Sequence, residues 1–137
     1  MAAIRGFGAN YFGQLGIDQP GSGHSNHCAV EFGGNDCIDI KDVSCGSQFS
    51  IILKKNGSIW FCGALNGTIF PLLTQVEVSY PLKCTQIACG KKHILALMEG
   101  GFVLSWGFGY FGQLGHGDDS SWDQPRYECL EYFSNQL

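Results

Sequence analysis

The strongest constraint in this sequence is an internal repeat at a shift of 44 residues. Identical residues fall in one register over a window of 19 positions: Cys45, Gly46, Leu53, Gly57 and Gly63 correspond to Cys89, Gly90, Leu97, Gly101 and Gly107. Apolar character is kept between them, since Ile51 corresponds to Leu95. A repeat of this length predicts one supersecondary unit used more than once, whose copies bury their apolar faces against each other.

Each copy contains two short apolar runs joined by a turn, at 50–53 and 58–62 in the first copy and at 94–97 and 102–106 in the second. The turns contain Asn56-Gly57 and Gly100-Gly101. These residues supply the positive φ angles that tight hairpin connections need. We therefore expect a β-hairpin in each copy.

A second similarity extends the repeat to both sides of this window. Residues 8–16 and 107–115 both begin with glycine and both end in Tyr-Phe-Gly-Gln-Leu-Gly. If Gly8, Gly63 and Gly107 mark the same point in three units, the spacings are 55 and 44 residues. Such spacings are typical of propeller blades with four short strands each.

Three phrases of the third unit carry a family resemblance. They are Cys-Gly-Lys-Lys-His-Ile-Leu-Ala-Leu at 89–97, Val-Leu-Ser-Trp-Gly at 103–107 and Phe-Gly-Gln-Leu-Gly-His-Gly-Asp at 111–118, followed by Pro125. Together they resemble the repeat of the regulator of chromosome condensation family. The resemblance implies a ring of seven blades, each of four antiparallel strands.

We therefore expect an all-β fold, a partial β-propeller of about two to three blades. Residues 1–137 are predicted to form a single repeat region with units beginning near Gly8, Gly63 and Gly107. Two and a half units cannot close a ring, so we expect a truncated chain or one that needs a partner. The segment 127–137 resembles the start of a further, truncated blade.

The middle unit departs from the pattern at two places. After Gly63 the Gly-Gln-Leu-Gly phrase is missing, which predicts a shortened outer loop. Phe49 stands where the third unit has His93. Neither change is expected to alter the fold.

Composition narrows the functional classes. With 45% hydrophobic and 15% charged residues, the 137-residue chain can bury a core. The net charge of −4 leaves no basic face for direct nucleic-acid binding. No apolar run reaches the length of a membrane span. The seven cysteines and the lack of a secretory signal predict reduced thiols in an intracellular protein, cytoplasmic or nuclear.

A dinucleotide-binding pattern is met by Gly107, Gly109 and Gly112, with Glu128 beyond. The twin segment has Asn10 in place of Gly109, an exchange that we attribute to a left-handed backbone position. Turn-forming residues also occupy the place where a phosphate-binding helix would begin. We therefore interpret this segment as a repeat loop and expect no bound cofactor.

Two groups of residues have spacings that could contribute to a zinc site: Cys84, Cys89 and His93, and His24, His27 and Cys28. The first group is better explained by the repeat, because Cys45 matches Cys89 but is followed by Phe49. The second has no twin in the repeat and stays a weaker alternative. No metal site is predicted.

No nucleophile and base can be paired in this sequence, so we expect no enzyme activity. The acidic residues at 118, 119 and 123 lack the regular alternation and closing glutamate of a calcium loop. They are interpreted as a solvated loop.

Five residues are predicted as possible partner contacts: Trp122, Asp118, Asp119, Tyr110 and Phe111. Aromatic residues in loops are the usual anchors of protein contacts. Because Tyr-Phe recurs at 11–12, a packing role between blades is favoured for that pair. Trp122 has no counterpart and is the stronger candidate for contact.

These features favour a protein-interaction module with an unidentified protein partner. The resemblance adds a second hypothesis, a guanine-nucleotide exchange factor for a small Ran-like GTPase, because the founding member of the family has that activity. A third hypothesis is a nonfunctional fragment or short isoform of a longer repeat protein.

Overall fold

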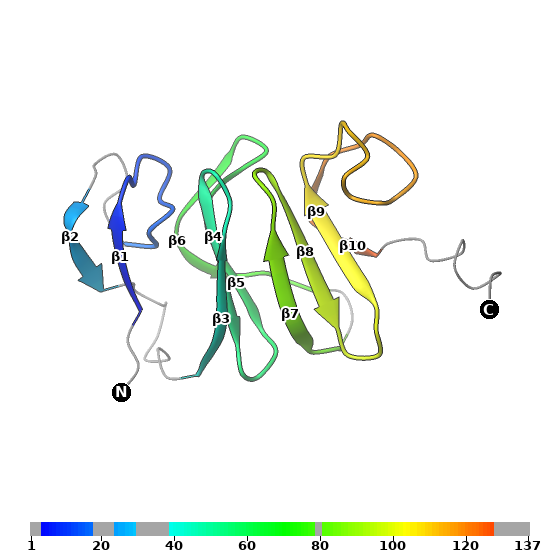
Figure 1. Ribbon diagram of the computed structural model, residues 1–137, viewed down its shortest axis with the longest axis horizontal. Coiled ribbons are helices and arrows are strands. Elements are labelled where there is room, and N and C mark those ends of the chain that lie inside the picture. The colour runs from blue at the N-terminus through cyan, green and yellow to red at the C-terminus, as the bar shows by residue number, and fades with distance from the viewer. Residues whose placement is uncertain (1–3, 18–23, 30–38, 79–80, 128–137) are drawn as a thin grey trace.

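The computed structural model describes residues 4–17, 24–29, 39–78 and 81–127, and of β2 and Tyr127 it describes the backbone only. The described residues form ten β-strands (Figure 1). The strands are β1 (Arg5–Gly8), β2 (His24–Ala29), β3 (Ile40–Cys45), β4 (Phe49–Lys54), β5 (Ile59–Leu65), β6 (Thr68–Gln75), β7 (Cys84–Cys89), β8 (His93–Met98), β9 (Val103–Gly107) and β10 (Trp122–Tyr127). The all-β prediction is confirmed.

The strands form three antiparallel sheets that stand side by side from the N-terminal to the C-terminal part of the chain (Figure 1). The first contains β1 and β2, the second β3-β4-β5-β6, and the third β7-β8-β9-β10. Consecutive strands pair in each four-stranded sheet, as in a propeller blade. Of the first unit, the structure describes the counterparts of β5 and β6. The predicted further blade at 127–137 lies outside the described residues except for Tyr127.

Both predicted hairpins are formed, one by β4 and β5 and the other by β8 and β9. Leu53 pairs with Ile59 in the first, and Leu97 pairs with Val103 in the second. The hairpin glycines at 57 and 101 have φ angles of 86° and 85°. Their equal backbone conformation explains why glycine recurs at this turn.

The glycines that align the three units share one backbone conformation. Gly8, Gly63 and Gly107 have φ angles of 105°, 108° and 109°. A Cβ atom on Gly63 would lie 2.3 Å from the carbonyl oxygen of Gln48, and one on Gly107 would lie 2.5 Å from that of Lys92. At Gly63 and Gly107, glycine is therefore required both for its φ angle and for the close approach of the neighbouring backbone, whereas Gly8 meets no atom within 4 Å.

The replacement of the repeat histidine by Phe49 leaves the local packing unchanged. Phe49 covers Gly46, where a Cβ atom would come within 2.2 Å of the ring. His93 covers Gly90 in the same way, at 2.1 Å. Both rings occupy the space that the glycine leaves open, which explains why glycine recurs at this position of each unit.

The main hydrophobic core lies between the second and third sheets. One wall comes from β4 and β5, the other from β7, β8 and β9; the buried members are Phe49, Ile51, Leu53, Ile59, Phe61, Leu65, Cys84, Ile87, Ile94, Ala96, Met98, Leu104 and Trp106. The ring of Phe49 stacks on that of Phe61 at 5.5 Å. Burial of apolar area at this interface is the main force that holds the two sheets together.

The first strands of the two large sheets, β3 and β7, converge. The Nζ of Lys41 donates a hydrogen bond to the carbonyl oxygen of Thr85 at 2.9 Å. The backbone nitrogen and the Oγ of Ser47 both donate to the carbonyl oxygen of Lys91, each at 2.9 Å. Both pairs are separated by 44 residues. Each therefore joins the same position of two successive units, as radial stacking of blades requires.

Candidate functional site

The loop 108–121 connects β9 to β10 and is built on consecutive glycine turns. The backbone nitrogen of Gly112 donates to the carbonyl oxygen of Gly109 at 2.9 Å, and that of Gly115 to Gly112 at 3.1 Å. The side-chain oxygen of Gln113 accepts a hydrogen bond from the backbone nitrogen of Phe111 at 2.9 Å. These bonds fix the conformation of the loop without a helix or strand.

The twin loop after β1 has the same hydrogen bonds. The backbone nitrogen of Gly13 donates to Asn10 at 3.2 Å, and that of Gly16 to Gly13 at 3.0 Å. Gln14 accepts from the backbone nitrogen of Phe12 at 2.9 Å. The repeated phrase thus encodes one loop conformation, in which glutamine is a structural residue.

The predicted reason for the exchange between Asn10 and Gly109 is wrong. Neither residue has a positive φ angle. Asn10 is buried, and its Oδ1 accepts a hydrogen bond from the backbone nitrogen of Leu15 at 3.0 Å. At Gly109 a Cβ atom would lie 2.0 Å from the carbonyl oxygen of Ser120, so close backbone contact requires glycine there. The residues after Gly112 form turns and then β10, so the helix that a dinucleotide phosphate needs does not begin there.

Two of the predicted contact residues project from the tip of this loop. The side chain of Tyr110 is 67% exposed and that of Phe111 is 88% exposed. Both rest against Phe108, with ring centroids 4.8 Å and 5.9 Å from it. The Nζ of Lys92 lies 5.6 Å above the ring of Phe108. The tip is therefore an aromatic cluster supported from below by the third sheet.

The predicted packing role of the Tyr-Phe pair has different outcomes at the two positions. Phe12 is half-buried and lines a cavity together with Phe49 of the second sheet, which follows it in the chain. Tyr11 is 64% exposed, like Tyr110. The phenylalanine of the first loop therefore faces a cavity that it shares with the following sheet, whereas the tyrosine is exposed in both loops.

The other three predicted contact residues lie where the loop enters β10. Trp122 is 38% exposed, and the guanidinium carbon of Arg126 lies 4.2 Å from its ring centroid. Asp118 forms an exposed ion pair with Arg126 at 3.4 Å, and its Oδ1 accepts a hydrogen bond from the backbone nitrogen of Ser120 at 3.1 Å. Asp119 is exposed. The structure thus brings Trp122 and Asp118 together through Arg126, a residue that the sequence did not single out.

A Ser-His contact lies beneath this loop and was not predicted. The Oγ of Ser105 donates to the carbonyl oxygen of Leu114 at 2.6 Å and lies 3.0 Å from the Nε2 of His116. Since the hydroxyl proton is used at Leu114, we assign the ring proton to Nε2. Ser105 has no exposed surface, so its oxygen cannot reach a substrate. The pair anchors the loop to β9.

The middle unit has the shortened outer loop that the sequence predicts. A two-residue turn, Asn66-Gly67, joins β5 to β6, with φ angles of 50° and 83°. The Nδ2 of Asn66 donates to the carbonyl oxygen of Trp122 at 3.3 Å and to Oδ1 of Asp123 at 3.0 Å. This turn therefore ties the second sheet to the start of β10.

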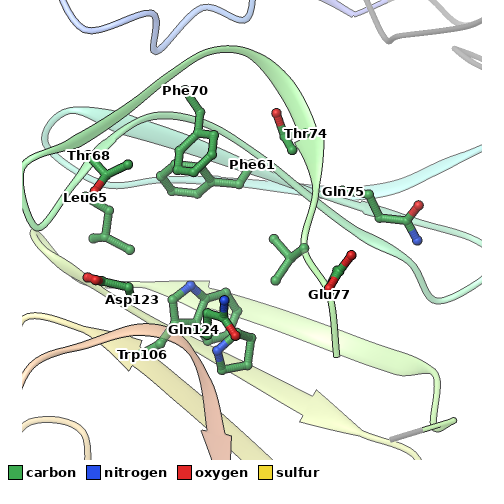
Figure 2. A pocket seen from close by; sticks show the side chains of 12 residues that line it. Phe61, Leu65, Thr68, Phe70, Thr74, Gln75, Glu77, Trp106, Asp123 and Gln124 are labelled. Carbon is green, nitrogen blue, oxygen red and sulfur yellow. The ribbon is translucent and has the colours of Figure 1, made fainter. Parts of the chain in front are cut away.

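A cavity of about 460 Å³ lies next to this turn, between the outer strands of the second and third sheets (Figure 2). Its walls are largely apolar, and carboxylates stand on two sides of it. The lining residues are Phe61, Leu65, Thr68, Phe70, Thr74, Gln75, Val76, Glu77, Trp106, Asp123, Gln124 and Pro125. This cavity was not predicted from the sequence.

Burial favours the thiol form of three cysteines, Cys62, Cys84 and Cys89. Burial raises the pKa of Cys62 to about 12 and that of Cys89 to about 11, and it also raises the pKa of Cys84. Metal binding requires the thiolate, which burial disfavours here. Within the described residues, no three His, Cys, Asp or Glu side chains gather to hold a metal ion. The side chains of His24, His27 and Cys28 are outside the described part.

The described residues contain no helix that is long and apolar enough to cross a membrane.

The stacked four-stranded sheets with glycine-turn loops define a repeat protein of the propeller class. The family model of the regulator of chromosome condensation (RCC1) repeat matches residues 6–53 and 100–134, and a second model of the same repeat matches 40–67 and 84–113. The chain belongs to the RCC1 repeat family, as the sequence phrases predicted.

Curated relatives include longer proteins of different kinds. Over 88 residues, or 57% of this chain, the mitochondrial RCC1 domain-containing protein RUG3 of Arabidopsis thaliana is 41% identical. The secretion-regulating guanine nucleotide exchange factor of Bos taurus is 34% identical over 83% of this chain. The X-linked retinitis pigmentosa GTPase regulator homolog of Caenorhabditis elegans is 32% identical over 85%. The matched regions span only 19%, 26% and 9% of these three proteins.

Solved structures show the same fold. Prp20p from Saccharomyces cerevisiae matches 92% of this chain and 34% of its own, with a TM-score of 0.81 and 23% identity. Human WBSCR16 matches 92% of this chain and 35% of its own, with a TM-score of 0.77 and 18% identity. The predicted partial propeller is therefore confirmed.

Proposed function

We propose that this chain is a protein-interaction module that contacts its partner through the loop 108–121 and Trp122. One observation carries the proposal: Tyr110 and Phe111 are 67% and 88% exposed on a loop that backbone hydrogen bonds hold in place. Exposing large aromatic side chains to water is unfavourable, and rigid aromatic anchors are the usual centres of protein contacts. The strands below supply the rigidity.

The charges around the loop indicate the chemistry of the partner surface. Asp118 and Asp119 are exposed in the same loop as the aromatic cluster, and Asp118 pairs with Arg126 at the surface. A partner surface with an apolar centre and lysine or arginine at its rim complements this arrangement.

The proposed role is binding without catalysis. Among the described residues, one serine oxygen lies beside a histidine ring, that of Ser105 next to His116. Ser105 is fully buried, so this pair is not placed to act on a substrate. Propellers place their variable loops on a fixed frame, which suits recognition.

A guanine-nucleotide exchange function is the second candidate. It is supported by the similarity to the bovine secretion-regulating guanine nucleotide exchange factor over 83% of this chain. The structural relative Prp20p is described with binding properties to Gsp1p and histones. This chain spans 26% of the bovine protein, so its capacity for exchange has to be measured on the chain itself.

Photo-crosslinking tests the first candidate. A benzophenone amino acid replaces Phe111 in one protein and Phe7, which is 71% exposed on β1, in a control. Crosslinking in cell extract should give one or a few discrete adducts from position 111 that position 7 does not give. Identical adduct patterns from both positions would contradict a binding role for the loop.

Fluorescent-nucleotide release from a panel of Ran-like and Rab-like GTPases tests the second candidate. Acceleration by the chain would support exchange activity. If micromolar chain leaves every release rate unchanged, the exchange hypothesis fails.

A further inference from the structure

The loop after β1 occupies a defined place on the second sheet. Its Gln14 carbonyl oxygen accepts hydrogen bonds from the Oγ of Ser50 at 2.7 Å and from the Sγ of Cys62 at 3.5 Å. Its Gly13 lies against Pro71, so closely that a Cβ atom would come within 2.4 Å of the Pro71 Cα. The loop therefore covers the sheet where β5 and β6 begin to diverge.

The cavity lies at the corresponding place on the third sheet. Trp106 stands 44 residues after Cys62 in the repeat register and forms part of the cavity wall. Asp123 follows the residue that pairs with Gly107, just as Pro71 follows the residue that pairs with Gly63. The second unit has only the Asn66-Gly67 turn where the first has its loop, which leaves this space open.

Trp106 presents an unused hydrogen-bond donor to the cavity. Its side chain is 2% exposed, yet its Nε1 donates no hydrogen bond within the described part of the chain. Figure 2 shows the indole on the floor of the cavity with its nitrogen on the side that faces Phe61. Cys62, at the same repeat position, donates to a loop carbonyl. Because the Nε1 of Trp106 opens on the cavity, a carbonyl group from a bound molecule would accept its hydrogen bond in place of water.

The remaining walls define what else the occupant must carry. Phe61 and Phe70 meet edge to face at 5.8 Å and form an apolar wall. Glu77 and Asp123 lie on opposite sides of the cavity in Figure 2. Asp123 already accepts from Asn66, whereas Glu77 is exposed and has no ion pair or hydrogen bond among the described residues. The site therefore favours an apolar group next to a positive charge.

We propose that this cavity binds an extended segment of a partner polypeptide in place of the loop that the second unit lacks. The segment places a backbone carbonyl on the Nε1 of Trp106, an apolar side chain against the wall formed by Phe61 and Phe70, and a lysine or arginine at Glu77. This site is separate from the loop 108–121 and does not depend on the function proposed for that loop.

The test uses the 137-residue chain and a peptide with the sequence of residues 11–17 followed by lysine, together with a displayed library of random peptides. Binding is followed by the three indole N–H signals in nitrogen-proton correlation spectra, since the chain has three tryptophans. A bound peptide should move the Trp106 signal downfield as it saturates and leave those of Trp60 and Trp122 in place. Selected library peptides should share a basic residue beside an apolar one.

Two exposed carboxylates provide a matched pair of variants. Glu77→Gln should weaken peptide binding roughly two- to fivefold, the effect of losing one exposed charge pair. Glu99→Gln, at the tip of the β8–β9 hairpin, should leave binding unchanged, and so should the double change Tyr110→Ala and Phe111→Ala. Both glutamate sites are exposed, so folding is not at risk.

Several outcomes overturn the proposal. One is that no peptide saturates the chain or moves the Trp106 signal, and another is that Glu77→Gln and Glu99→Gln bind equally well. A Trp106 signal that moves with the concentration of the chain alone identifies a second copy as the occupant. Loss of peptide binding in the Tyr110→Ala and Phe111→Ala protein would place the peptide on the loop instead.

Discussion

Ser47 donates two hydrogen bonds, from its backbone nitrogen and its hydroxyl, to the carbonyl oxygen of Lys91. The two residues occupy the same position of successive units. This contact links the β3–β4 connection of one sheet to the β7–β8 connection of the next. It therefore sets the spacing of the sheets at their converging edge, while the core between them determines the angle at which they spread.

Replacing Ser47 with alanine tests this link. The hydroxyl bond is lost and the backbone bond remains, so the free energy of unfolding should fall by about 0.5–1 kcal/mol. Urea denaturation followed by circular dichroism measures the change. Ser47→Thr keeps a hydroxyl and should stay close to the unchanged protein; equal destabilisation by threonine and alanine would show that the hydroxyl contributes nothing.

The repeat glycines make a sharper prediction. Gly63→Ala adds a Cβ atom 2.3 Å from a backbone oxygen at a φ angle of 108°, and we expect a loss of at least about 2–4 kcal/mol. Gly101→Ala meets no atom within 4 Å at a φ angle of 85°, so only the conformational cost of about 1 kcal/mol remains. Thermal unfolding of both variants gives the comparison. A smaller loss at Gly63 than at Gly101 would be inconsistent with the packing described.

The buried thiols predict an alkaline limit to stability. The folded protein raises the pKa of Cys62 from 9.0 to about 12 and that of Cys89 to about 11, so the folded state binds these protons more tightly than the unfolded state. Their contribution is complete below pH 9 and is lost as the pH rises towards 12. Urea midpoints measured across this range should fall steadily.

Thiol labelling followed by peptide mapping provides the second measurement. At pH 8 the exposed Cys45 should be labelled well before Cys62. If Cys62 reacts as fast as Cys45 in the folded protein, the described burial is wrong.

The hypothesis of a nonfunctional fragment predicts different unfolding from that of a folded module. The core shared by the second and third sheets should make them unfold together, so circular dichroism and tryptophan fluorescence should report one coincident transition. A broad change without a transition would favour the fragment hypothesis.

The sequence was sufficient to predict the hairpins, the repeat register and the short Asn66-Gly67 turn, because glycine positions and alternating apolar residues act locally. It did not predict that Ser105 meets His116, which depends on how the loop folds back over β9. It also gave the wrong reason for Gly109, whose constraint is the carbonyl of Ser120 across the loop. Contacts across a loop are invisible to a repeat comparison when the twin residue is packed differently.

The sequence predicted which residues could contact a partner, but it did not predict the neighbouring residues that hold their side chains in place. Trp122 was favoured because it has no twin, but the guanidinium group of Arg126 over its ring was not predicted. The cavity was not predicted either, because it results from a loop that is absent in one unit and from a tryptophan contributed by the next. The boundaries of the repeat units and the predicted partner contacts stay predictions.

The affinity of the crosslinked partner for three forms of the chain tests the binding proposal most directly. The double change Tyr110→Ala and Phe111→Ala removes two exposed side chains, so the melting temperature should not change, while affinity should fall at least about 30-fold, or about 2 kcal/mol. Tyr11→Ala, at the same position of the twin loop, should bind as tightly as the unchanged chain. Equal affinity of all three forms would contradict the proposed role of the loop.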